Sequence, residues 1–345
     1  MSSDTISSPA SAASLYSRLP ANLTSTHNQH RAPAKATRTQ SLLEKVLFAV
    51  FGSTILLAAV ALYITNTPEH RMVPNKFAAG VKSDRVNVLL IETSVRANRP
   101  SGMGDVSTES IMMLSIQPST GKSVLMSIPA DLWVKVGRYG ERPLRAAHMV
   151  GDSSGYPGEG AGLTVDTVEQ SIGQPIHAYA AIDIGDVKRL VDSIGGVDVN
   201  VEQGLYDFKN RDRFVRGEHH LNGVRALRYA HSQNVVGPAA DRFARESRQQ
   251  QLFAAALTKV ATLRDVTGLG MALDRSHTNL TREQVTMLRD VIRSHGLQRV
   301  SLEPYMDIVE VSGVAYRGEA VSPHGGDFDT VRHFAGTVFN IATIQ

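Results

Sequence analysis

The feature that most constrains this chain is an uncharged apolar run at residues 46–64. The run is 19 residues long and is dominated by Leu, Ile, Val, Ala and Phe. At about 1.5 Å per residue, a helix of this length nearly spans the roughly 30 Å hydrocarbon core of a bilayer. A signal peptide has a shorter apolar region close to the N-terminus and a small-residue cleavage site. We therefore expect an uncleaved transmembrane helix at residues 46–64.

The charges before this run predict its orientation. Residues 1–45 carry five basic side chains against two acidic ones, Asp4 and Glu44. The positive-inside tendency places this tail in the cytoplasm and the residues after about 66 outside the cell. The tail is rich in Ser, Thr, Ala and Pro, which favours disorder. We therefore expect a single-pass cell-membrane protein with a cytoplasmic N-terminus and an extracytoplasmic C-terminal domain.

The overall charge does not indicate a nucleic-acid partner. The chain has 36 Lys plus Arg and 33 Asp plus Glu, and its pI is about 9.1. Without the tail, 31 residues of each sign remain, so the exported part is formally neutral. A general basic surface for nucleic acid is thus not supported. The absence of cysteine excludes disulfides and thiolate metal sites.

The exported part alternates between strand-like and helix-like segments. Apolar runs predict strands, and apolar residues at helical spacing predict helices. The residues 117–122 between two predicted strands are turn-forming, which predicts an antiparallel hairpin. The predicted strands are 86–91, 111–116, 123–128, 178–182 and 197–201, and the predicted helices are 163–172 and 187–194. The pattern predicts an α/β or α+β layered domain, a mixed central β-sheet flanked by helices.

The C-terminal residues continue this pattern without a catalytic constellation. Residues 280–292 predict an amphipathic helix that starts at Thr281, with Gln284 three residues later. A short strand at 300–302 and a helix at 329–344 follow. We divide the exported part into a linker at residues 65–85, a domain at 86–260, and an extension of the same domain at 261–345.

The segment at residues 241–251 is the richest in candidate binding residues. Arg245 and Arg248 are three residues apart and so share one face of a predicted helix, where two guanidinium groups suit a phosphate. An alternative is a solvated helix start, in which the arginines meet Asp241 and Glu246. Further along the helix, Phe253 begins an apolar stripe at helical spacing.

Seven segments in order carry a family resemblance. They are residues 87–91 leading to Arg96, 109–116, 127–131, 163–169, 183–198, 217–229 and 241–251. Together they resemble the LytR–CpsA–Psr family of membrane-anchored cell-envelope proteins, over about residues 86–260. The sequence has no phosphate-binding P-loop, so a nucleotide-triphosphate site is not favoured.

The resemblance implies an apolar tunnel for a polyprenyl chain, with its mouth near Arg96 and Arg245, and an arginine-lined pyrophosphate pocket with Mg²⁺. It further implies a phosphotransferase that moves a polyprenyl-pyrophosphate-linked glycan to peptidoglycan or another wall acceptor at the membrane. The residues assigned by the resemblance are Arg96 and Arg245 as catalytic groups, Arg96, Asp241, His231, Arg245, Arg248 and Gln249 as pyrophosphate or substrate ligands, and Glu109 as the Mg²⁺ ligand. The resemblance does not place Arg242 in the phosphate pocket.

The sequence departs from the family pattern where the chemistry is expected. Ser94 occupies the position of a usual aspartate, and Glu109 replaces another. Ala130 replaces an arginine, and His231 and Gln233 stand where two further arginines are typical. A protonated histidine binds phosphate, but its charge depends on pH near neutrality. These changes leave open an alternative, a non-catalytic paralogue that binds polyprenyl phosphate or glycan in a regulatory role.

Overall fold

The computed structural model describes residues 84–95, 106–263, 277–312 and 316–340. These residues belong to the larger of two compact units, Val46–Gln345. The predicted transmembrane segment at 46–64 and Arg96 lie outside the described residues. Within the described part of the chain, no helix is long and apolar enough to cross a membrane.

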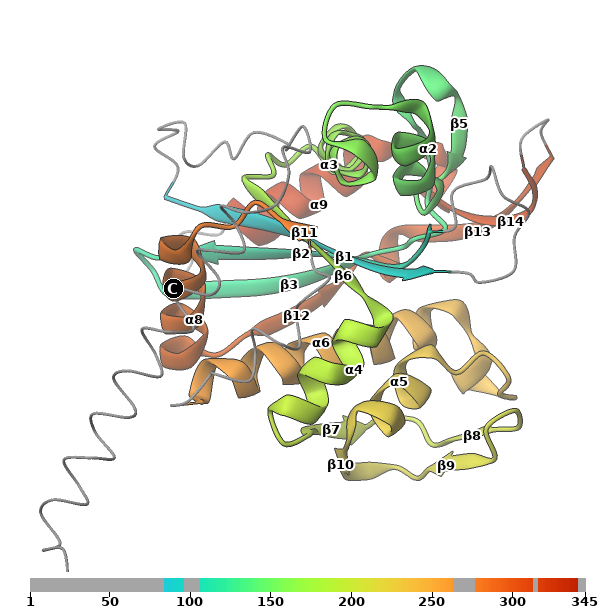
Figure 1. Cartoon of the computed structure of the whole chain (residues 1–345). Helices are drawn as coiled ribbons and strands as arrows, with labels where there is room; N and C mark the ends of the chain where they lie inside the picture. The colour runs from blue at the N-terminus through green and yellow to red at the C-terminus, as the bar shows by residue number, and fades with distance from the viewer. Residues whose placement is uncertain (1–83, 96–105, 264–276, 313–315, 341–345) are drawn as a thin grey trace, which may run out of the picture. The chain divides into compact units, whose positions relative to one another are not determined.

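A six-stranded mixed sheet forms the centre of the domain (Figure 1). In order across the sheet, its strands are β11 (His277–Thr278), β6 (Ala178–Asp183), β1 (Val86–Val95), β2 (Val106–Gln117), β3 (Lys122–Ile128) and β12 (Gln298–Ser301). β2 pairs antiparallel with both β1 and β3, which confirms the predicted hairpin. β1 and β6 are parallel, as are β3 and β12.

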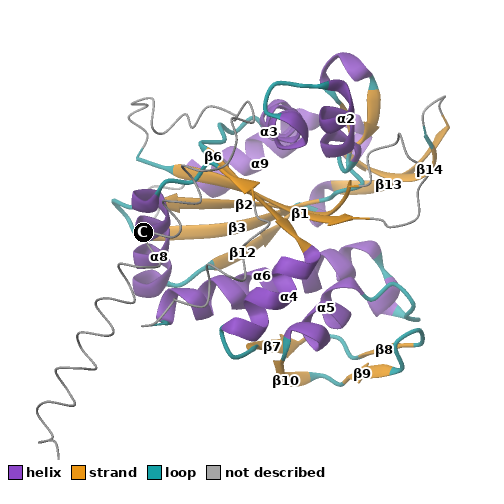
Figure 2. Ribbon diagram, in the orientation of Figure 1, coloured by secondary structure: helices purple, strands orange, loops and turns teal. Residues whose placement is uncertain are grey.

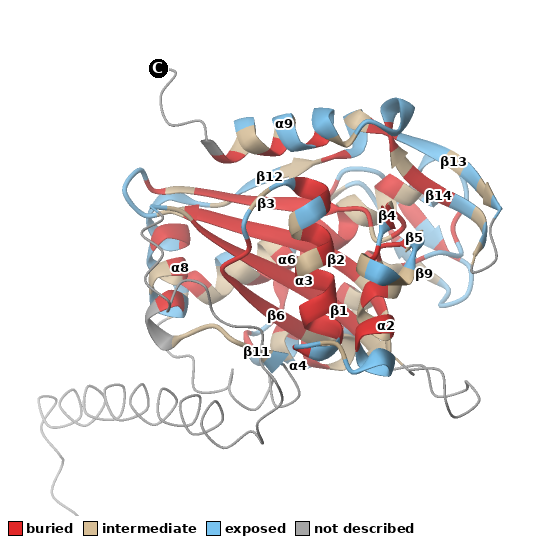
Figure 3. Cartoon of the chain, turned by 90° about the horizontal axis from the view of Figure 1, so that it is seen from above, coloured by how far each residue is buried: buried red, intermediate tan, exposed pale blue. Residues whose placement is uncertain are grey.

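Helices cover both faces of this sheet (Figure 2). One face carries α2 (Ala146–Ser154), α3 (Glu159–Ile172) and α9 (Phe328–Asn340), and the other carries α4 (Ile184–Ser193), α5 (Gly223–His231), α6 (Arg242–Thr262) and α8 (Arg282–His295). Because successive strand residues point to opposite faces, Val88 and Leu90 enter one apolar cluster, and Leu89 and Ile91 enter the other. Burial on both sides explains why residues 88–91 of β1 are all apolar (Figure 3).

Four two-stranded ribbons and four short 3₁₀ turns (η) surround these layers in the described residues. The ribbons are β4 (Trp133–Lys135) with β5 (Glu141–Pro143), β7 (Val197–Val201) with β10 (Gly217–Leu221), β8 (Leu205–Asp207) with β9 (Asp212–Phe214), and β13 (Met306–Ser312) with β14 (Arg317–Pro323). The turns are η1 (Gly137–Tyr139), η2 (Pro238–Ala240), η3 (Glu303–Tyr305) and η4 (His324–Gly326). The predicted strand at 197–201 is therefore confirmed, but it pairs with β10 and does not join the central sheet.

The other predicted elements also form. The helix predicted at 163–172 begins earlier, at Glu159, and ends at Gly173, whose φ of 71° is a left-handed cap. α9 ends at Asn340, so the last residues of the helix predicted at 329–344 lie outside the described part. The C-terminal residues supply β11 and β12 to opposite edges of the sheet, so they complete the same layered fold.

The start of α8 yields a stability prediction. The Thr281 hydroxyl accepts a hydrogen bond from Gln284 N at 3.3 Å, and Gln284 Oε1 accepts one from Thr281 N at 2.8 Å. Thr281→Ala should lower the free energy of unfolding by about 0.5–2 kcal/mol, because the helix loses its cap. Urea denaturation measures this, with Thr281→Ser as the matched control that keeps the hydroxyl. Equal losses in both variants would contradict the capping role.

Candidate functional site

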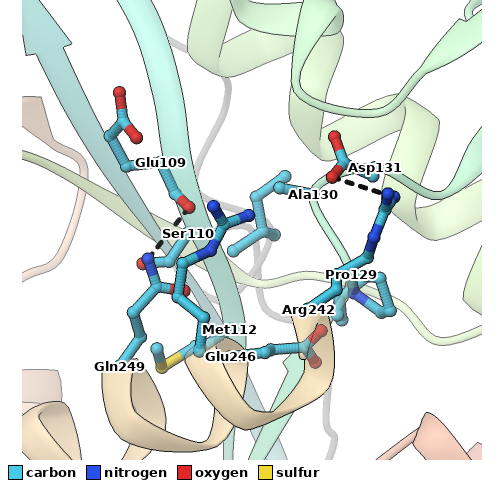
Figure 4. A pocket seen from close by; sticks show the side chains of 12 residues that line it. Glu109, Ser110, Met112, Pro129, Ala130, Asp131, Arg242, Glu246 and Gln249 are labelled. Atoms are coloured by element: carbon cyan, nitrogen blue, oxygen red, sulfur yellow. Dashed lines mark hydrogen bonds and ion pairs between the residues drawn. The ribbon is translucent and has the colours of Figure 1, made fainter. Parts of the chain in front are cut away.

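A polar pocket lies where β2 begins, β3 ends and α6 makes its first turns (Figure 4). It contains about 360 Å³ of empty space, part of which is open to solvent. The polar residues that line it are Glu109, Ser110, Asp131, Arg242, Arg245, Glu246 and Gln249. The pocket therefore gathers side chains from three elements that the sheet and α6 hold in place.

α6 contributes four of these side chains from one face. Arg242, Arg245, Glu246 and Gln249 follow the i, i+3, i+4, i+7 spacing of a single helix stripe. Asp241 sets the start of the helix, because its Oδ2 accepts hydrogen bonds from Phe243 N at 2.8 Å and Ala244 N at 3.2 Å. The structure thus places Asp241, a predicted substrate ligand, at the N-cap and outside the pocket lining.

A β-bulge positions Glu109. Glu92 of β1 pairs with Ser110 and Thr93 pairs with Thr108, which leaves Glu109 as the extra residue on β2. The Glu109 carboxylate accepts a hydrogen bond from Ser94 Oγ at 2.6 Å, and Figure 4 shows this side chain pointing away from Asp131. The Glu109 main-chain oxygen accepts a bond from Gln249 Nε2 at 3.3 Å, which links the bulge to α6.

His231 lies behind the pocket wall, paired with a buried carboxylate. Its Nε2 is 3.0 Å from Glu92 Oε1, and Ser110 Oγ donates to Glu92 Oε2 at 2.8 Å. Burial alone would lower the pKa of His231, but the Glu92 charge, the hydrogen bond to Glu92 and the Glu109 charge together raise the pKa above its ordinary value. His231 Nδ1 is 3.2 Å from Gln249 Nε2. The predicted phosphate ligand His231 therefore contacts Glu92 and the back of Gln249 and does not line the pocket.

Arg248 is directed into the core. Only 5% of it is exposed, its Nε donates to Tyr229 O at 2.9 Å, and its Nη2 donates to Ser232 O at 2.9 Å. Burial lowers the pKa of Arg248 to about 10, so the side chain stays charged at neutral pH. The two arginines predicted to lie side by side therefore separate, because Arg245 lines the pocket and Arg248 holds the end of α5 against α6.

Arg245 is the pocket cation that remains available for an anion. Burial lowers the pKa of its guanidinium, and the Glu109 carboxylate partly offsets this. Among the described residues, Arg245 forms no ion pair. The other pocket arginine, Arg242, is engaged through Nη1 with Asp131 Oδ2 and through Nη2 with Glu319 Oε2, both at 3.1 Å.

Arg242 also lines this pocket. The sequence resemblance did not place it in the phosphate pocket, but it lies on the pocket face of α6 three residues before Arg245. Asp131, only 8% exposed, pairs with both Arg242 and Arg145. This ionic cluster fixes the turn after β3 and neutralises the Arg242 charge. The helical spacing from Arg245 is the signal that could have identified Arg242.

A metal cage is not formed by the described residues alone. No group of three or more His, Cys, Asp or Glu side chains in this part of the chain is arranged to hold a metal ion. Glu109 offers one carboxylate at the pocket, and Mg²⁺ typically uses one or two carboxylates together with substrate phosphates. Glu109 therefore fits a shared site, with the remaining ligands from substrate and water.

Comparisons with known proteins identify relatives of this chain. The model of the LytR_cpsA_psr family matches residues 58–313. The polyisoprenyl-teichoic acid–peptidoglycan teichoic acid transferase TagU of Bacillus cereus is 30% identical over 210 residues, which cover 59% of this chain and 63% of that protein. The protein of the same name from Oceanobacillus iheyensis is 30% identical over 198 residues, covering 56% of this chain and 57% of that one. The matches thus span less than two thirds of these relatives.

Solved structures share the fold. The crystal structure of B. subtilis TagV matches with a TM-score of 0.58 at 22% identity, over 76% of this chain and 100% of that one. A structure of TagT bound to LI-WTA matches with a TM-score of 0.57 at 19% identity, over 75% of this chain and 92% of that one. These likenesses confirm the predicted mixed sheet with flanking helices.

The contrast between the two α6 arginines is testable. Arg248→Met should lower the free energy of unfolding by about 2 kcal/mol or more, because it leaves the carbonyls of Tyr229 and Ser232 without this donor. Arg245→Met should change it by less than about 1 kcal/mol. Urea denaturation of both variants measures the difference. If the two losses were equal, the separate roles assigned to these arginines would be wrong.

Proposed function

Since this chain belongs to the LytR_cpsA_psr family, we propose that it transfers a polyprenyl-pyrophosphate-linked glycan to peptidoglycan or another cell-wall acceptor. The names of the curated relatives support this class of substrate and acceptor. The observation in this chain that carries the proposal is Arg245, a half-buried cation in a polar pocket with no ion-pair partner among the described residues.

The chemistry that such a site supports is phosphoryl transfer. When the acceptor oxygen attacks the phosphorus next to the glycan, polyprenyl phosphate leaves and negative charge builds on its oxygens. A preorganised guanidinium stabilises that charge more in the transition state than in the ground state. Arg245 provides this group, and Arg96, which follows β1 in the sequence, would add a second. His231, Gln249 and Arg248 support α6 around the pocket.

We include Mg²⁺ in this proposal, because the Glu109 carboxylate would hold it together with the substrate phosphates. A divalent cation supplies further charge neutralisation at the pyrophosphate. Chelation with EDTA should abolish transfer, and added Mg²⁺ should restore it. Full activity in EDTA would remove the metal from the proposal.

We also propose that residues 46–64 anchor the protein in the cell membrane, with residues 67–345 on the outer side. The uncharged run and the basic excess before it support this topology. Protease added to intact spheroplasts should degrade the C-terminal domain. Survival of that domain, when the same protease degrades the detergent-solubilised protein, would contradict the topology.

A binding or regulatory role is the second candidate. Ala130 carries no charge, Arg242 is held by two carboxylates, and Arg248 is buried, so the described pocket has few cations for a leaving group. Incubation of the purified full-length protein with a synthetic polyprenyl-pyrophosphate-linked disaccharide, Mg²⁺ and isolated peptidoglycan separates the two. Labelled peptidoglycan and released polyprenyl phosphate support transfer, whereas lipid binding without product supports the second role.

A substitution of Arg245 tests the pocket directly. Arg245→Ala should weaken binding of the polyprenyl-pyrophosphate lipid by about 1.5–3 kcal/mol, the scale of a hydrogen bond to a charged group, with little loss of folding stability. Titration calorimetry and thermal melting measure the two quantities. Arg293→Ala, which removes an exposed arginine of α8 outside the pocket, is the matched control. Equal affinity of wild type and Arg245→Ala would show that Arg245 is not a phosphate ligand.

A further inference from the structure

The proposed phosphoryl transfer leaves one acidic group of the pocket without a role, namely Glu246. This residue follows Arg245 on the pocket face of α6, and Figure 4 shows its carboxyl group beneath Pro129 and the Arg242 side chain. Its Oε1 is shielded from solvent and has no hydrogen-bond partner among the described residues. The Ser127 hydroxyl of β3 lies near the carboxyl group and acts to lower its pKa.

The other carboxylates of this region are engaged differently. Asp131 pairs with Arg145 and Arg242, Glu109 accepts the Ser94 hydroxyl, and Glu92 accepts from Ser110 and contacts His231. Asp131 Oδ1 is shielded as well but faces Arg145, whereas Glu246 Oε1 has neither a hydrogen-bond donor nor an ion-pair partner in the described part of the chain. Burying an acceptor without a donor is unfavourable, so the site favours a ligand that brings an N–H or O–H group.

Of the groups that take part in the proposed reaction, only some can donate a hydrogen bond to Glu246. Pyrophosphate oxygens are acceptors and carry negative charge, so they do not satisfy a carboxylate oxygen. The hydroxyl group of a wall-glycan acceptor is a donor, and it must lose its proton during the reaction. Glu246 lines the same pocket as Arg245, so its carboxyl group would lie near a hydroxyl that attacks a phosphorus bound there.

The ionisation of Glu246 suits this task. Burial raises its pKa to about 7, although the Ser127 hydrogen bond and the Arg245 charge act in the opposite direction. The charges of Glu303 on η3 and of Asp241 at the N-cap raise the pKa further. Arg242, which also lines the pocket, is neutralised by Asp131 and Glu319. A general base is most effective when its pKa lies near the working pH.

We propose that Glu246 is the general base that activates the acceptor hydroxyl in this reaction, an inference that rests on the transfer function proposed above. The acceptor proton passes to the Glu246 carboxylate as the acceptor oxygen bonds to the phosphorus attached to the glycan. The bond from that phosphorus to the bridging oxygen breaks, and polyprenyl phosphate leaves with the electron pair. Glu246 then returns the proton to solvent or to the departing phosphate.

The test uses the full-length protein in detergent with the synthetic polyprenyl-pyrophosphate-linked disaccharide and isolated peptidoglycan. Glu246→Gln preserves the size of the side chain but accepts no proton, so kcat should fall at least about 100-fold while KM for the lipid does not rise. The kcat of the wild-type enzyme should rise with pH around pH 7, as Glu246 loses its proton. This rise, the limb of the pH profile, should be absent in the variant. Because the amide removes the cost of ionising a shielded carboxyl, the variant should melt no lower than wild type above that pH.

Glu303→Gln is the matched control. Glu303 lies outside the pocket lining, so kcat should be retained, but loss of its negative charge should lower the pKa of Glu246 and shift the limb to lower pH. A Glu246→Gln enzyme with wild-type kcat and an unchanged limb overturns the role of Glu246 while the transfer function stands. Absence of product from wild-type protein overturns the proposed transfer itself, and the role of Glu246 with it.

Discussion

The site depends on one constraint, the fixed orientation of α6 about its own axis, which decides which of its side chains face the pocket. Gln250 donates to Leu125 O of β3 at 2.9 Å and to Val300 O of β12 at 2.7 Å, so one amide fastens the helix across two strands. Arg248 and Gln251 bond to α5 through Tyr229, and the Asp241 cap fixes where the helix starts. These contacts turn the helix face that carries Arg242, Arg245, Glu246 and Gln249 toward the pocket. Binding chemistry and core packing are thus set by one helix orientation.

The opposite wall of the pocket depends on a break in β-sheet regularity. The bulge at Glu109 ends the regular alternation of β2 where Glu92 is buried, only 1% exposed, against His231 and Ser110. The two ring contacts of His231 join β1 to α6, because its Nδ1 meets Gln249, which in turn bonds to the Glu109 carbonyl. A raised pKa of His231 keeps this pair ionic to a higher pH than for an isolated histidine. The wall and the helix are therefore coupled through buried polar contacts.

The central layers were predictable from sequence because their residues are buried on both faces or at helical spacing. The apolar runs of β1, β2 and β3 and the cap of α8 at Thr281 belong to this class. The ribbon β13–β14 was not predicted, because β13 is mostly exposed and its pairing has no apolar signature. Of the candidate site, Arg245, Gln249 and Glu109 do line the pocket. A helix turns about 100° per residue, so Arg248 points roughly 110° around the helix axis from the middle of the pocket stripe. The three-residue spacing between Arg245 and Arg248 is therefore not enough to bring both side chains into one site.

The departures from the family pattern leave the pocket with few positive charges, and this charge balance affects how it could bind an anion. The described lining holds two arginines and three acidic residues, and one arginine is already paired with Asp131 and Glu319. If every carboxyl were ionised, a pyrophosphate would meet net repulsion, which Arg245 alone would not offset. A proton on Glu246 removes one of these charges, and the burial that raises its pKa to about 7 makes that proton available near neutrality. Phosphate binding and proton occupancy of Glu246 are therefore linked: the protonated form favours binding of the anion, and the ionised form that acts as the base is reached as the pH rises through about 7.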